Sequence, residues 1–240
     1  TGGYSGESVI SYKSAETIRK NIDPAKWDCY LIDINPQGWF YIDARGDKFS
    51  VDKNDFSVTA GNEKITFDAV LIGLHGTPGE DGKLQGYFDC LKIPYSTCDA
   101  ATSALTFNKR FTVAVASFAG MHVARSLHLF KDNPLTAAEI LAQLTLPLFI
   151  KPNNGGSSLG ISKVKEAGEL EAAILKAFNE DDQVLVEEFI TGREFTIGVF
   201  KSKGKIIALP ITEIVTQNEF FDFNAKYEGA SEEITPASVD

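Results

Sequence analysis

Several features that mark other classes of protein are missing from this sequence. Its 240 residues contain no apolar run close to the roughly 18–20 residues that a membrane-spanning helix needs. Cysteine is scarce as well: Cys29, Cys90 and Cys98 are odd in number and show no C-x-x-C spacing. We therefore expect free thiols, two of them at buried helix or strand positions, in a reducing cytoplasmic compartment.

Positive charge is in short supply too. Lysine and arginine together number 23 against 33 aspartates and glutamates, which gives a net charge of −10. Nucleic-acid phosphates are held by basic surfaces, so this balance argues against DNA or RNA as the main partner. The remaining composition, 43% hydrophobic and 23% charged, is typical of a soluble globular protein, and the length indicates two or three subdomains.

The P-loop spelling G-x-x-x-x-G-K-[ST] is absent, although one stretch is rich in glycine and serine. LPLFIKPNNGGSSLGISKV, from Leu146 to Val164, has a strand-like segment at each end, so no helix start follows the glycines. This setting predicts a hairpin flap, in which small residues let backbone amides approach a phosphate. Lys151 would add a positive charge, and Ser157 and Ser158 would add hydroxyl donors. Taken alone, the stretch fits an ordinary flexible hairpin tip equally well.

Helix and strand patterns alternate through the first 97 residues. A helical pattern at Glu7–Ile22 is followed by a strand-like run at Tyr30–Ile34 and a hairpin at Phe40–Val51. A continuous apolar run at Phe67–Leu74 and a second helical pattern at Lys83–Ile93 come next. The continuous apolar run is typical of a parallel strand that is covered on both faces. We therefore expect an open parallel α/β sheet of the Rossmann-like type here.

The remainder of the chain groups its strands together. Asp99 is expected to cap one long helix over Ala100–Phe118, and T-A-A-E at Thr136–Glu139 is a capping box. After a further helix, three strands are predicted in succession at Gln183–Phe189, Glu194–Lys201 and Lys205–Pro210. Such grouping indicates a second, antiparallel α+β region.

Polar residues at the expected strand ends are candidates for ligand binding. His75 lies in LHGTPGEDG, at the carboxyl edge of the apolar run, where open α/β sheets bind ligands, and it is a candidate acid–base or contact group. Glu80 and Asp81 in the same stretch are better explained as caps of the next helix. Glu7, after the glycine turn GGYSGE, has the position of a residue that interacts with a helix dipole.

Two later segments also carry candidates. The acids of VEEFITGREFTIGV, Val186–Val199, would suit an adenine amino group or ribose hydroxyls, although exposed charges on an edge strand explain the spacing better. NEFFDFNAKYEGA, Asn218–Ala230, is aromatic and charged without a clear period, which is typical of an ordered functional loop. Each signal is weak by itself, but their order along the chain is informative.

Taken in order, these stretches resemble the D-alanine–D-alanine ligases, which are ATP-grasp enzymes of peptidoglycan synthesis. The matching blocks cover almost the whole chain: GGYSGE, LHGTPGEDGKLQGYFDCLKIPYS, the Asn108-Lys109 pair, IKPNNGGSSLGISKV, VEEFITGREFTIGV, LPITEI, FFDFNAKYEGA and TPA. The resemblance implies an ATP-grasp fold with a substrate domain at 1–97, a central subdomain with the glycine-rich flap at 98–186, and the start of a C-terminal subdomain at 187–240.

The resemblance also implies roles for individual residues. Glu7, His75 and Ser157 would hold the first D-alanine. Glu7, Ser157 and Tyr227 would form a hydrogen-bonded trio that closes the site, and Lys226 would reach the γ-phosphate. ATP would be contacted by a larger set: Lys109, Lys151, Ser157, Ser158, Glu187, Glu188, Phe189, Ile190, Glu194, Phe220 and Lys226.

The implied reaction has two steps, in which one D-alanine is phosphorylated on its carboxylate by ATP and a second D-alanine then displaces the phosphate. The family uses Mg²⁺ or Mn²⁺, acts in the cytoplasm on precursors of the cell wall as a homodimer, and needs neither nucleic acid nor membrane. Its metal ligands follow the TPA block, so we expect them beyond Asp240 and none within this chain. We also expect that the chain continues at both ends in a longer protein, and that this piece is inactive alone.

Two alternatives remain open. A related ATP-grasp ligase would join D-alanine to D-lactate or D-serine, or another carboxylate to an amine, although Tyr227 of the AKY loop favours D-alanine as the acceptor. A non-catalytic nucleotide-binding protein with the same fold would bind ATP without D-alanine-dependent release of ADP. Glu7 and His75 argue against the second alternative, because they match the amino acid site and not the nucleotide site.

Overall fold

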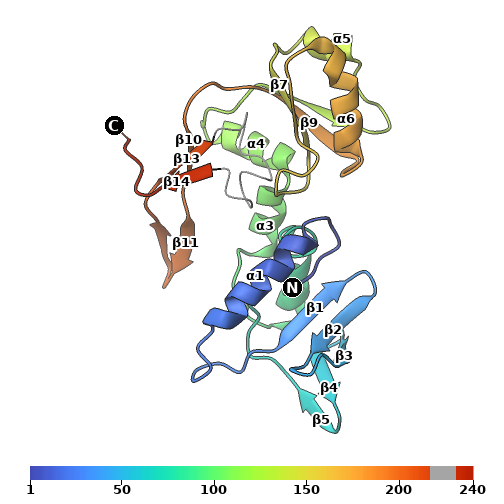
Figure 1. Cartoon of the computed structure of the whole chain (residues 1–240), viewed down its shortest axis with the longest axis vertical. Coiled ribbons are helices and arrows are strands. Elements are labelled where there is room, and N and C mark those ends of the chain that lie inside the picture. Colours follow the sequence, from blue (N-terminus) through green and yellow to red (C-terminus); the bar gives the residue numbers. More distant parts are fainter. Residues whose placement is uncertain (217–230, 240) are drawn as a thin grey trace. The chain divides into compact units, whose positions relative to one another are not determined.

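A computed structural model describes residues 1–216 and 231–239, which belong to two compact units (Figure 1). The first unit comprises Thr1–Met121 together with Asn154–Gly156, and the second comprises His122–Asn153 and Ser157–Asp240. Within the described ranges, no helix combines the length and the apolar character that crossing a membrane requires.

The described part of the first unit contains helices and a five-stranded sheet. In chain order they are α1 (Ser8–Asn21), β1 (Leu31–Asn35), β2 (Gly38–Ile42), β3 (Lys48–Asp52), β4 (Ser57–Ala60), β5 (Glu63–Ile65), α2 (Lys83–Leu91), α3 (Ala100–Phe107) and α4 (Lys109–Phe118). The strands lie side by side in sequence order, and each neighbouring pair is antiparallel. The predicted first helix, first strand, hairpin and second helix are confirmed, and β4 and β5 extend the hairpin.

Parallel pairing in this unit appears only as two isolated bridges. One joins Gly2 to Ile34, and the other joins Val70 to Tyr95. The predicted strand over Phe67–Leu74 was wrong, because the segment has no strand pairing beyond the bridge at Val70. The short turns that connect β1 to β5 allow only antiparallel neighbours, whereas a parallel pair needs a crossover of about a dozen residues or more.

The single long helix predicted over Ala100–Phe118 is two helices, α3 and α4, separated at Asn108. As predicted, the Asp99 side chain caps α3 by accepting a hydrogen bond from the Thr102 amide (2.8 Å). Asn108 caps α4 in the same way, accepting from the Phe111 amide at 3.0 Å, and its extended backbone interrupts the helical path. An asparagine side chain that bonds to nearby backbone breaks a helix without changing its apolar pattern, so the pattern did not reveal the break.

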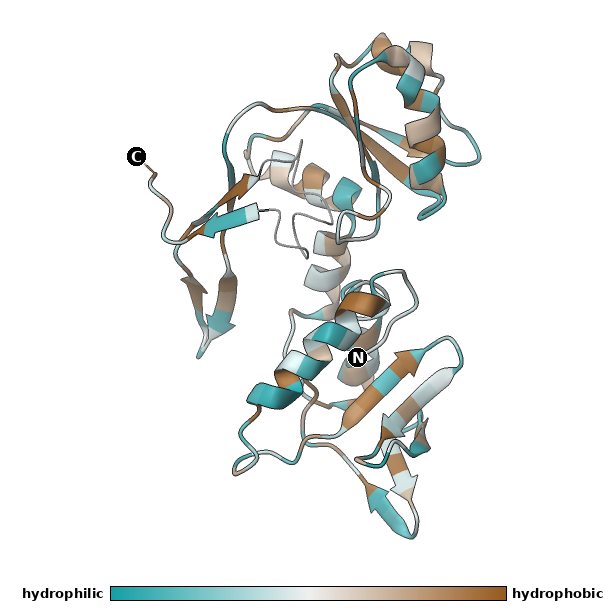
Figure 2. Ribbon diagram, viewed as in Figure 1, coloured by the Kyte–Doolittle hydropathy of each residue, from teal (hydrophilic) through white to brown (hydrophobic). Residues whose placement is uncertain are grey.

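An aromatic-rich core fills the first unit. The rings of Phe56 and Phe88 meet edge to face with their centroids 4.8 Å apart. Figure 2 shows hydrophobic and hydrophilic residues mixed along α1 and β1, as burial on one side requires. The buried apolar residues of this core cluster are Ile34, Val51, Phe56, Val58, Leu74, Leu84 and Phe88.

All three cysteines are free, as predicted, but all three are exposed, so the expectation of buried positions was wrong. Cys90 shows the reason. The buried residues of α2 are Leu84, Gln85 and Phe88, and with 3.6 residues per turn Cys90 falls on the opposite side of that helix.

Strands dominate the second unit. In chain order its elements are β6 (Ser126–Phe130), α5 (Ala137–Leu141), β7 (Leu148–Pro152), β8 (Ser162–Val164), a short 3-10 turn (Ala167–Glu169), α6 (Leu170–Phe178), β9 (Gln183–Glu188), β10 (Glu194–Thr196), β11 (Val199–Ser202), β12 (Lys205–Ala208), β13 (Thr212–Thr216) and β14 (Ser231–Ile234). They form the antiparallel sheets β6-β9-β7-β8, β10-β13-β14 and β11-β12. This arrangement confirms the antiparallel α+β region and the capping box at Thr136–Glu139.

The strand predicted over Glu194–Lys201 is divided, because its two halves join different sheets. β10 pairs with β13, whereas β11 pairs with β12. Gly198 lies between them, and its carbonyl accepts a hydrogen bond from the Leu209 amide at 2.8 Å. An apolar pattern records burial and not the choice of partner strand, so it did not separate β10 from β11.

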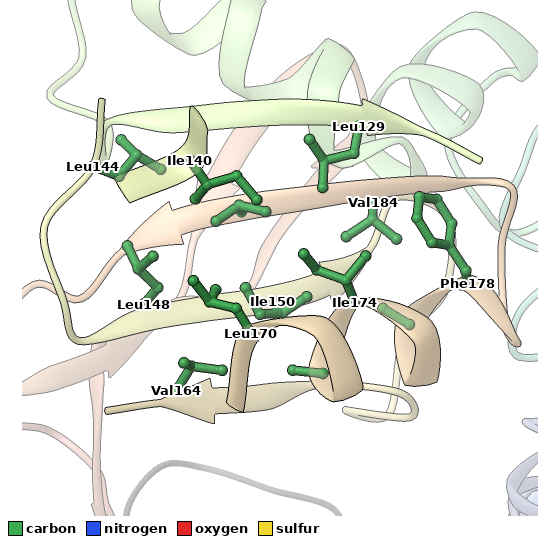
Figure 3. Packing of buried hydrophobic residues seen from close by; sticks show 13 residues of the cluster. Leu129, Ile140, Leu144, Leu148, Ile150, Val164, Leu170, Ile174, Phe178 and Val184 are labelled. Atoms are coloured by element: carbon green, nitrogen blue, oxygen red, sulfur yellow. The ribbon is translucent and has the colours of Figure 1, made fainter. Parts of the chain in front are cut away.

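Helix α6 packs on one face of the sheet β6-β9-β7-β8. Leu170, Ile174 and Phe178 recur at four-residue spacing and face Ile150 and Val184 (Figure 3). Residues of α5 and the adjoining segments complete this cluster, of which Ile140 and Leu148 have no exposed surface. Helices α6 and α5 thus cover the apolar face of the sheet, and polar side chains such as Lys151 and Glu187 lie on its other face.

Leu170→Ala should destabilise the second unit by about 2–5 kcal/mol, because it removes a side chain with no exposed surface and leaves a cavity. The matched control is Leu175→Ala on the same helix, where 60% of the side chain is exposed, and its effect should stay within about 0.5 kcal/mol. Urea denaturation followed by far-ultraviolet circular dichroism measures both effects. Tryptophan fluorescence is less suitable, because Trp27 and Trp39 lie in the first unit. Equal effects of the two substitutions would contradict this packing.

Candidate functional site

The glycine turn at the start of the chain is held by backbone hydrogen bonds from two directions. The Gly3 amide donates to the Ile34 carbonyl of β1 at 2.6 Å, and the Tyr4 amide donates to the Thr77 carbonyl at 2.8 Å. Gly2 has a φ of +94°, and a Cβ at this position would lie 2.3 Å from the Ile34 carbonyl oxygen. Glycine is therefore required for this close approach.

The Glu7 side chain is buried beside backbone that only glycine leaves room for. Only 3% of Glu7 is exposed. A Cβ on Gly76 would lie 2.6 Å from one carboxylate oxygen of Glu7, and a Cβ on Gly156 would lie 2.6 Å from the other. The carboxylate is thus enclosed by glycine-containing loops within the first unit, a more specific position than that of a simple dipole partner at a helix start.

The His75 ring is positioned by helix α1 and by its own loop. Its Nε2 lies 2.9 Å from the Ser14 hydroxyl, and its backbone amide donates to the Ser11 hydroxyl at 2.9 Å. On the other side of the ring, Nδ1 lies 3.8 Å from a carboxylate oxygen of Glu80. Serines on one helix face therefore fix both the backbone and the ring of this histidine.

The expectation that Glu80 caps helix α2 was wrong. Glu80 turns back and accepts a hydrogen bond from the Gly76 amide at 2.7 Å, and Gly82 is the N-cap residue of the helix instead. Asp81 accepts from the Lys83 amide at 3.3 Å and also from the Thr77 hydroxyl. Burial raises the pKa of the Glu80 carboxyl, and the charge of Glu7 raises it further, while the Gly76 amide and His75 act against this.

Lys109 is the first residue of helix α4, and the tip of the glycine-rich stretch lies against it. The Lys109 ammonium donates to the Gly155 carbonyl at 2.7 Å. The neighbouring Asn108 side chain donates to the Asn154 side chain at 3.1 Å, and the two residues also form an antiparallel bridge. Lys109 is one of the lysines that are predicted to contact ATP, together with Lys151 and Lys226.

In the second unit, the predicted hairpin around the glycine-rich stretch is confirmed. Strands β7 and β8 are antiparallel, and Phe149 lies opposite Lys163 in their register. At the base, Asn153 is fully buried, and its amide donates to the Gln183 carbonyl at 2.8 Å. Ser157 and Ser158 both have left-handed backbone, with φ of 51° and 58°. That conformation is uncommon outside glycine and is typical of functional loops.

Strand alternation separates two sets of side chains on β7 and β9. Ile150 and Val186 belong to the core beneath α6, so their neighbours Lys151 and Glu187 lie on the opposite face. There the Lys151 ammonium forms an ion pair with the Glu187 carboxylate. The same ammonium lies 5.2 Å from the centroid of the Phe149 ring. Both charges are more than half buried, and each supplies the other with a partner.

The two adjacent acids at the end of β9 have different surroundings. Glu188 is turned away from Lys151 by the alternation, and its carboxylate accepts from the Thr145 amide at 3.1 Å. It also lies 3.4 Å from the Arg125 guanidinium. Glu187 and Glu188 were predicted together as contacts of ATP, but the structure gives only Glu187 a place beside Lys151.

Phe149 and Lys163 lie on this face and were missed by the sequence analysis. The Phe149 and Phe189 rings have centroids 5.8 Å apart, and the Lys163 ammonium lies 3.7 Å from the centroid of Phe189. Phe149 and Lys163 stand at alternate positions to the core residues Ile150 and Val164. Marking those apolar positions on the two hairpin strands would have placed both missed residues on the face of Lys151.

The remaining predicted site residues lie further along the chain. Ile190 is 67% exposed after β9, and Glu194 begins β10, where it pairs with Ile214. Phe220, Lys226 and Tyr227 lie outside the described residues, so the trio of Glu7, Ser157 and Tyr227 stays a prediction. In residues 1–216 and 231–239, no group of three histidine, cysteine or acidic side chains is placed to hold a metal ion.

Comparisons with known proteins match this chain to D-alanine–D-alanine ligases over almost its whole length. The family model for the D-ala D-ala ligase N-terminus matches residues 1–98, and that for the D-ala D-ala ligase C-terminus matches residues 107–240. The D-alanine–D-alanine ligase of Flavobacterium johnsoniae is 49% identical over 99% of this chain and 74% of its own length. The corresponding ligase of Parabacteroides distasonis is 48% identical over 99% of this chain and 72% of its own.

Solved structures agree in fold. The VanG D-Ala:D-Ser ligase from Enterococcus faecalis has a TM-score of 0.81 and 35% identity, covering 100% of this chain and 75% of that one. D-alanyl-alanine synthetase A from Vibrio cholerae has a TM-score of 0.84 and 26% identity, covering 99% of this chain and 72% of that one. The chain therefore belongs to the D-alanine–D-alanine ligase family and has its ATP-grasp fold.

Proposed function

We propose that this protein joins two molecules of D-alanine to D-alanyl-D-alanine at the expense of ATP, in the supply of peptidoglycan precursors. The observation that carries the proposal is the buried Glu7 carboxylate beside Gly76, on the loop that also presents His75. Glu7 and His75 match the amino acid site of the family and not its nucleotide site, which argues against a nucleotide-binding protein without an amino acid substrate. The relatives named D-alanine–D-alanine ligase support the choice of substrate.

In the first unit, Glu7 would bind the ammonium group of the first D-alanine. A buried carboxylate is a strong acceptor for an ammonium donor, because little water competes for it. His75 would contact the same amino acid, with its ring held by Ser14 and its backbone by Ser11. The role of Ser157 at this position is part of the same proposal and rests on the family pattern.

In the second unit, Lys151 and Glu187 would bind opposite ends of the nucleotide. Their ion pair would open as ATP enters, with a phosphate replacing Glu187 as the partner of Lys151 and the adenine amino group replacing Lys151 as the partner of Glu187. Guanine presents an oxygen acceptor in place of that amino group, so Glu187 would select adenine. Lys109, which bonds to the Gly155 carbonyl, would exchange that contact for a phosphate.

The chemistry would proceed by positioning and charge neutralisation. The D-alanine carboxylate oxygen attacks the γ-phosphorus, the bond to the β-phosphate oxygen breaks, and ADP leaves. The neutral amine of the second D-alanine then attacks the acylphosphate carbonyl, the tetrahedral intermediate loses inorganic phosphate, and the amine gives up a proton. No covalent enzyme nucleophile is required. The flap would exclude water that otherwise hydrolyses the acylphosphate.

Further assignments complete the proposal. Ser158, Phe189 and Ile190 would line the nucleotide site, Glu194 would bind the ribose, and Glu188 would contribute only its backbone. Phe220, Lys226 and Tyr227 would close over the substrates. The division at 97 and 186, the homodimer and a cytoplasmic location stay predictions. Mg²⁺ or Mn²⁺ is expected to accompany ATP. Among the described residues, no group of three histidine, cysteine or acidic side chains gathers to hold it.

The full-length protein should release ADP from ATP only when D-alanine is present, and the product should be D-alanyl-D-alanine. L-Alanine is the matched control. D-serine and D-lactate, offered as acceptors, test the alternative specificities. The structural similarity to the D-Ala:D-Ser ligase suggests the test with D-serine. Coupled ADP detection with mass spectrometry of the products measures this. ATP binding without ADP release under any of these conditions would leave a nucleotide-binding protein as the better interpretation.

Glu187→Gln should raise the KM for ATP about tenfold or more, because it weakens the charge-assisted hydrogen bond proposed for the adenine amino group. Glu188→Gln is the matched control: it should leave the KM for ATP within about twofold, and instead lower the free energy of unfolding by on the order of 1 kcal/mol. Steady-state kinetics with ATP and GTP, together with urea denaturation, separate the two effects. An equal rise in KM for both variants would contradict the assignment of faces.

Ser14→Ala should raise the KM for D-alanine about threefold to tenfold and leave the KM for ATP unchanged, because the His75 ring loses the hydroxyl that orients it. Ser14→Thr retains a hydroxyl and should behave like the natural protein. Thr17→Ala, one turn along α1, removes a hydroxyl that donates to the Lys13 carbonyl and serves as the control. A Ser14→Ala enzyme with natural kinetics, or one altered in its use of ATP, would remove Ser14 from this role.

A further inference from the structure

A row of three side chains crosses the polar face of the sheet β6-β9-β7-β8. Phe149 on β7 lies directly opposite Lys163 on β8 and directly opposite Glu187 on β9. Since these positions alternate with the core residues beneath α6, all three side chains project from the same face. Lys163 is therefore part of the same surface as the Lys151–Glu187 pair, one strand further from Glu187.

The contacts of Phe189 show which side chain Lys163 holds in place. The Phe189 amide donates to the Pro147 carbonyl at 3.1 Å, so the backbone is anchored where the chain leaves β9. Its ring is contacted from two sides of the same hairpin: the Phe149 centroid lies 5.8 Å away, and the Lys163 ammonium lies 3.7 Å from the Phe189 centroid. An ammonium this close to a ring centroid is in the range of a cation–π interaction, and partial burial strengthens it.

We propose that Lys163 is a positioning residue of the nucleotide site, whose ammonium holds the Phe189 ring against Phe149 so that the base meets a fixed aromatic surface. Lys163 would act on the base through Phe189 and would not bind the phosphates. This inference rests on the proposed function, since it takes the face of Lys151 and Glu187 as the place where ATP binds. It adds a residue outside the set for which the resemblance implies contacts to ATP.

The division of work between two lysines supports the proposal. Lys151 lies 5.2 Å from the Phe149 centroid, farther than Lys163 lies from Phe189, and it also pairs with Glu187. Lys151 is thus placed to exchange a carboxylate for a phosphate. Lys163 lies over the Phe189 ring, which follows the end of β9. A side chain without such a contact can populate more than one staggered rotamer. Fixing that ring before the base arrives lowers the ordering cost of binding.

Lys163→Gln in the full-length protein removes the charge at similar length and should raise the KM for ATP about threefold to tenfold. The turnover number and the KM for D-alanine should stay within about twofold. Lys163→Arg keeps a cation that binds aromatic faces and should restore the KM for ATP. The matched control is Lys165→Gln, an exposed lysine just beyond β8, which should match the natural protein. Natural kinetics for Lys163→Gln, or an arginine variant as impaired as the glutamine one, would overturn the proposal.

Binding of adenosine and of ADP, measured by calorimetry, separates the ring from the phosphates. Lys163→Gln should weaken both by the same factor, and it should have no further effect in a Phe189→Leu background, because the ring on which Lys163 acts is gone. If Lys163→Gln weakened the binding of ADP but not of adenosine, Lys163 would be assigned to the phosphates and the proposal would be overturned. The same would follow if Lys163→Gln weakened ADP binding as strongly in the Phe189→Leu background as in the natural protein. If the natural protein failed to release ADP with D-alanine, the ligase function would fall, while these binding measurements would still decide the role of Lys163.

Discussion

The two-residue alternation of the strands in the sheet β6-β9-β7-β8 is the constraint on which the candidate nucleotide site depends. Leu148 and Ile150 have no exposed surface beneath α6, and the residues between and after them, Phe149 and Lys151, project to the other face. A slip of one residue in β7 would bury Lys151 and expose Ile150. The apolar contacts with α6 therefore do more than stabilise the unit, because they also fix which charges and rings face the ligand.

The ion pair of Lys151 and Glu187 shows how such a face is stabilised without a ligand. Two partly buried charges that lacked partners would be costly, and here each has the other. A nucleotide that separates them must replace both contacts, so it must present an anion to the lysine and a hydrogen-bond donor to the carboxylate. ATP offers both through a phosphate and the adenine amino group. Inorganic phosphate could replace Glu187 as the partner of Lys151, but it lacks the adenine amino group that would pair with Glu187.

Features that depend on local hydrogen bonding were predictable from the sequence. Features that depend on which strands pair with one another were not. The capping box at Thr136–Glu139 and the cap at Asp99 follow from side chains that satisfy the first amides of a helix, and both are present. The flap hairpin followed from its two flanking strands. The helix break at Asn108 was missed, because an internal cap does not disturb the apolar period on which the long helix was predicted.

The site residues divide along the same line. Family motifs supplied Glu7, His75, Lys151 and Glu187, but the motif that contains two adjacent acids did not say that they face opposite ways. That distinction comes from the register of β9 against β7. Lys163 was overlooked for the opposite reason. It lies in the block IKPNNGGSSLGISKV, but the resemblance implies no role for it, and only the strand pairing that sets it opposite Phe149 brings it to the same face.

The carboxylates around Gly76 constrain how an amino acid would lie in the first unit. Glu80 bonds to the Gly76 amide, the Glu7 carboxylate lies against the same glycine, and the charge of Glu7 is one cause of the raised pKa of Glu80, after burial. A ligand ammonium entering here would lower this repulsion, whereas a ligand carboxylate would increase it. An amino acid would therefore bind with its ammonium toward Glu7 and its carboxylate directed away. That orientation leaves the carboxylate accessible to a phosphoryl donor, as the first step of the proposed reaction requires.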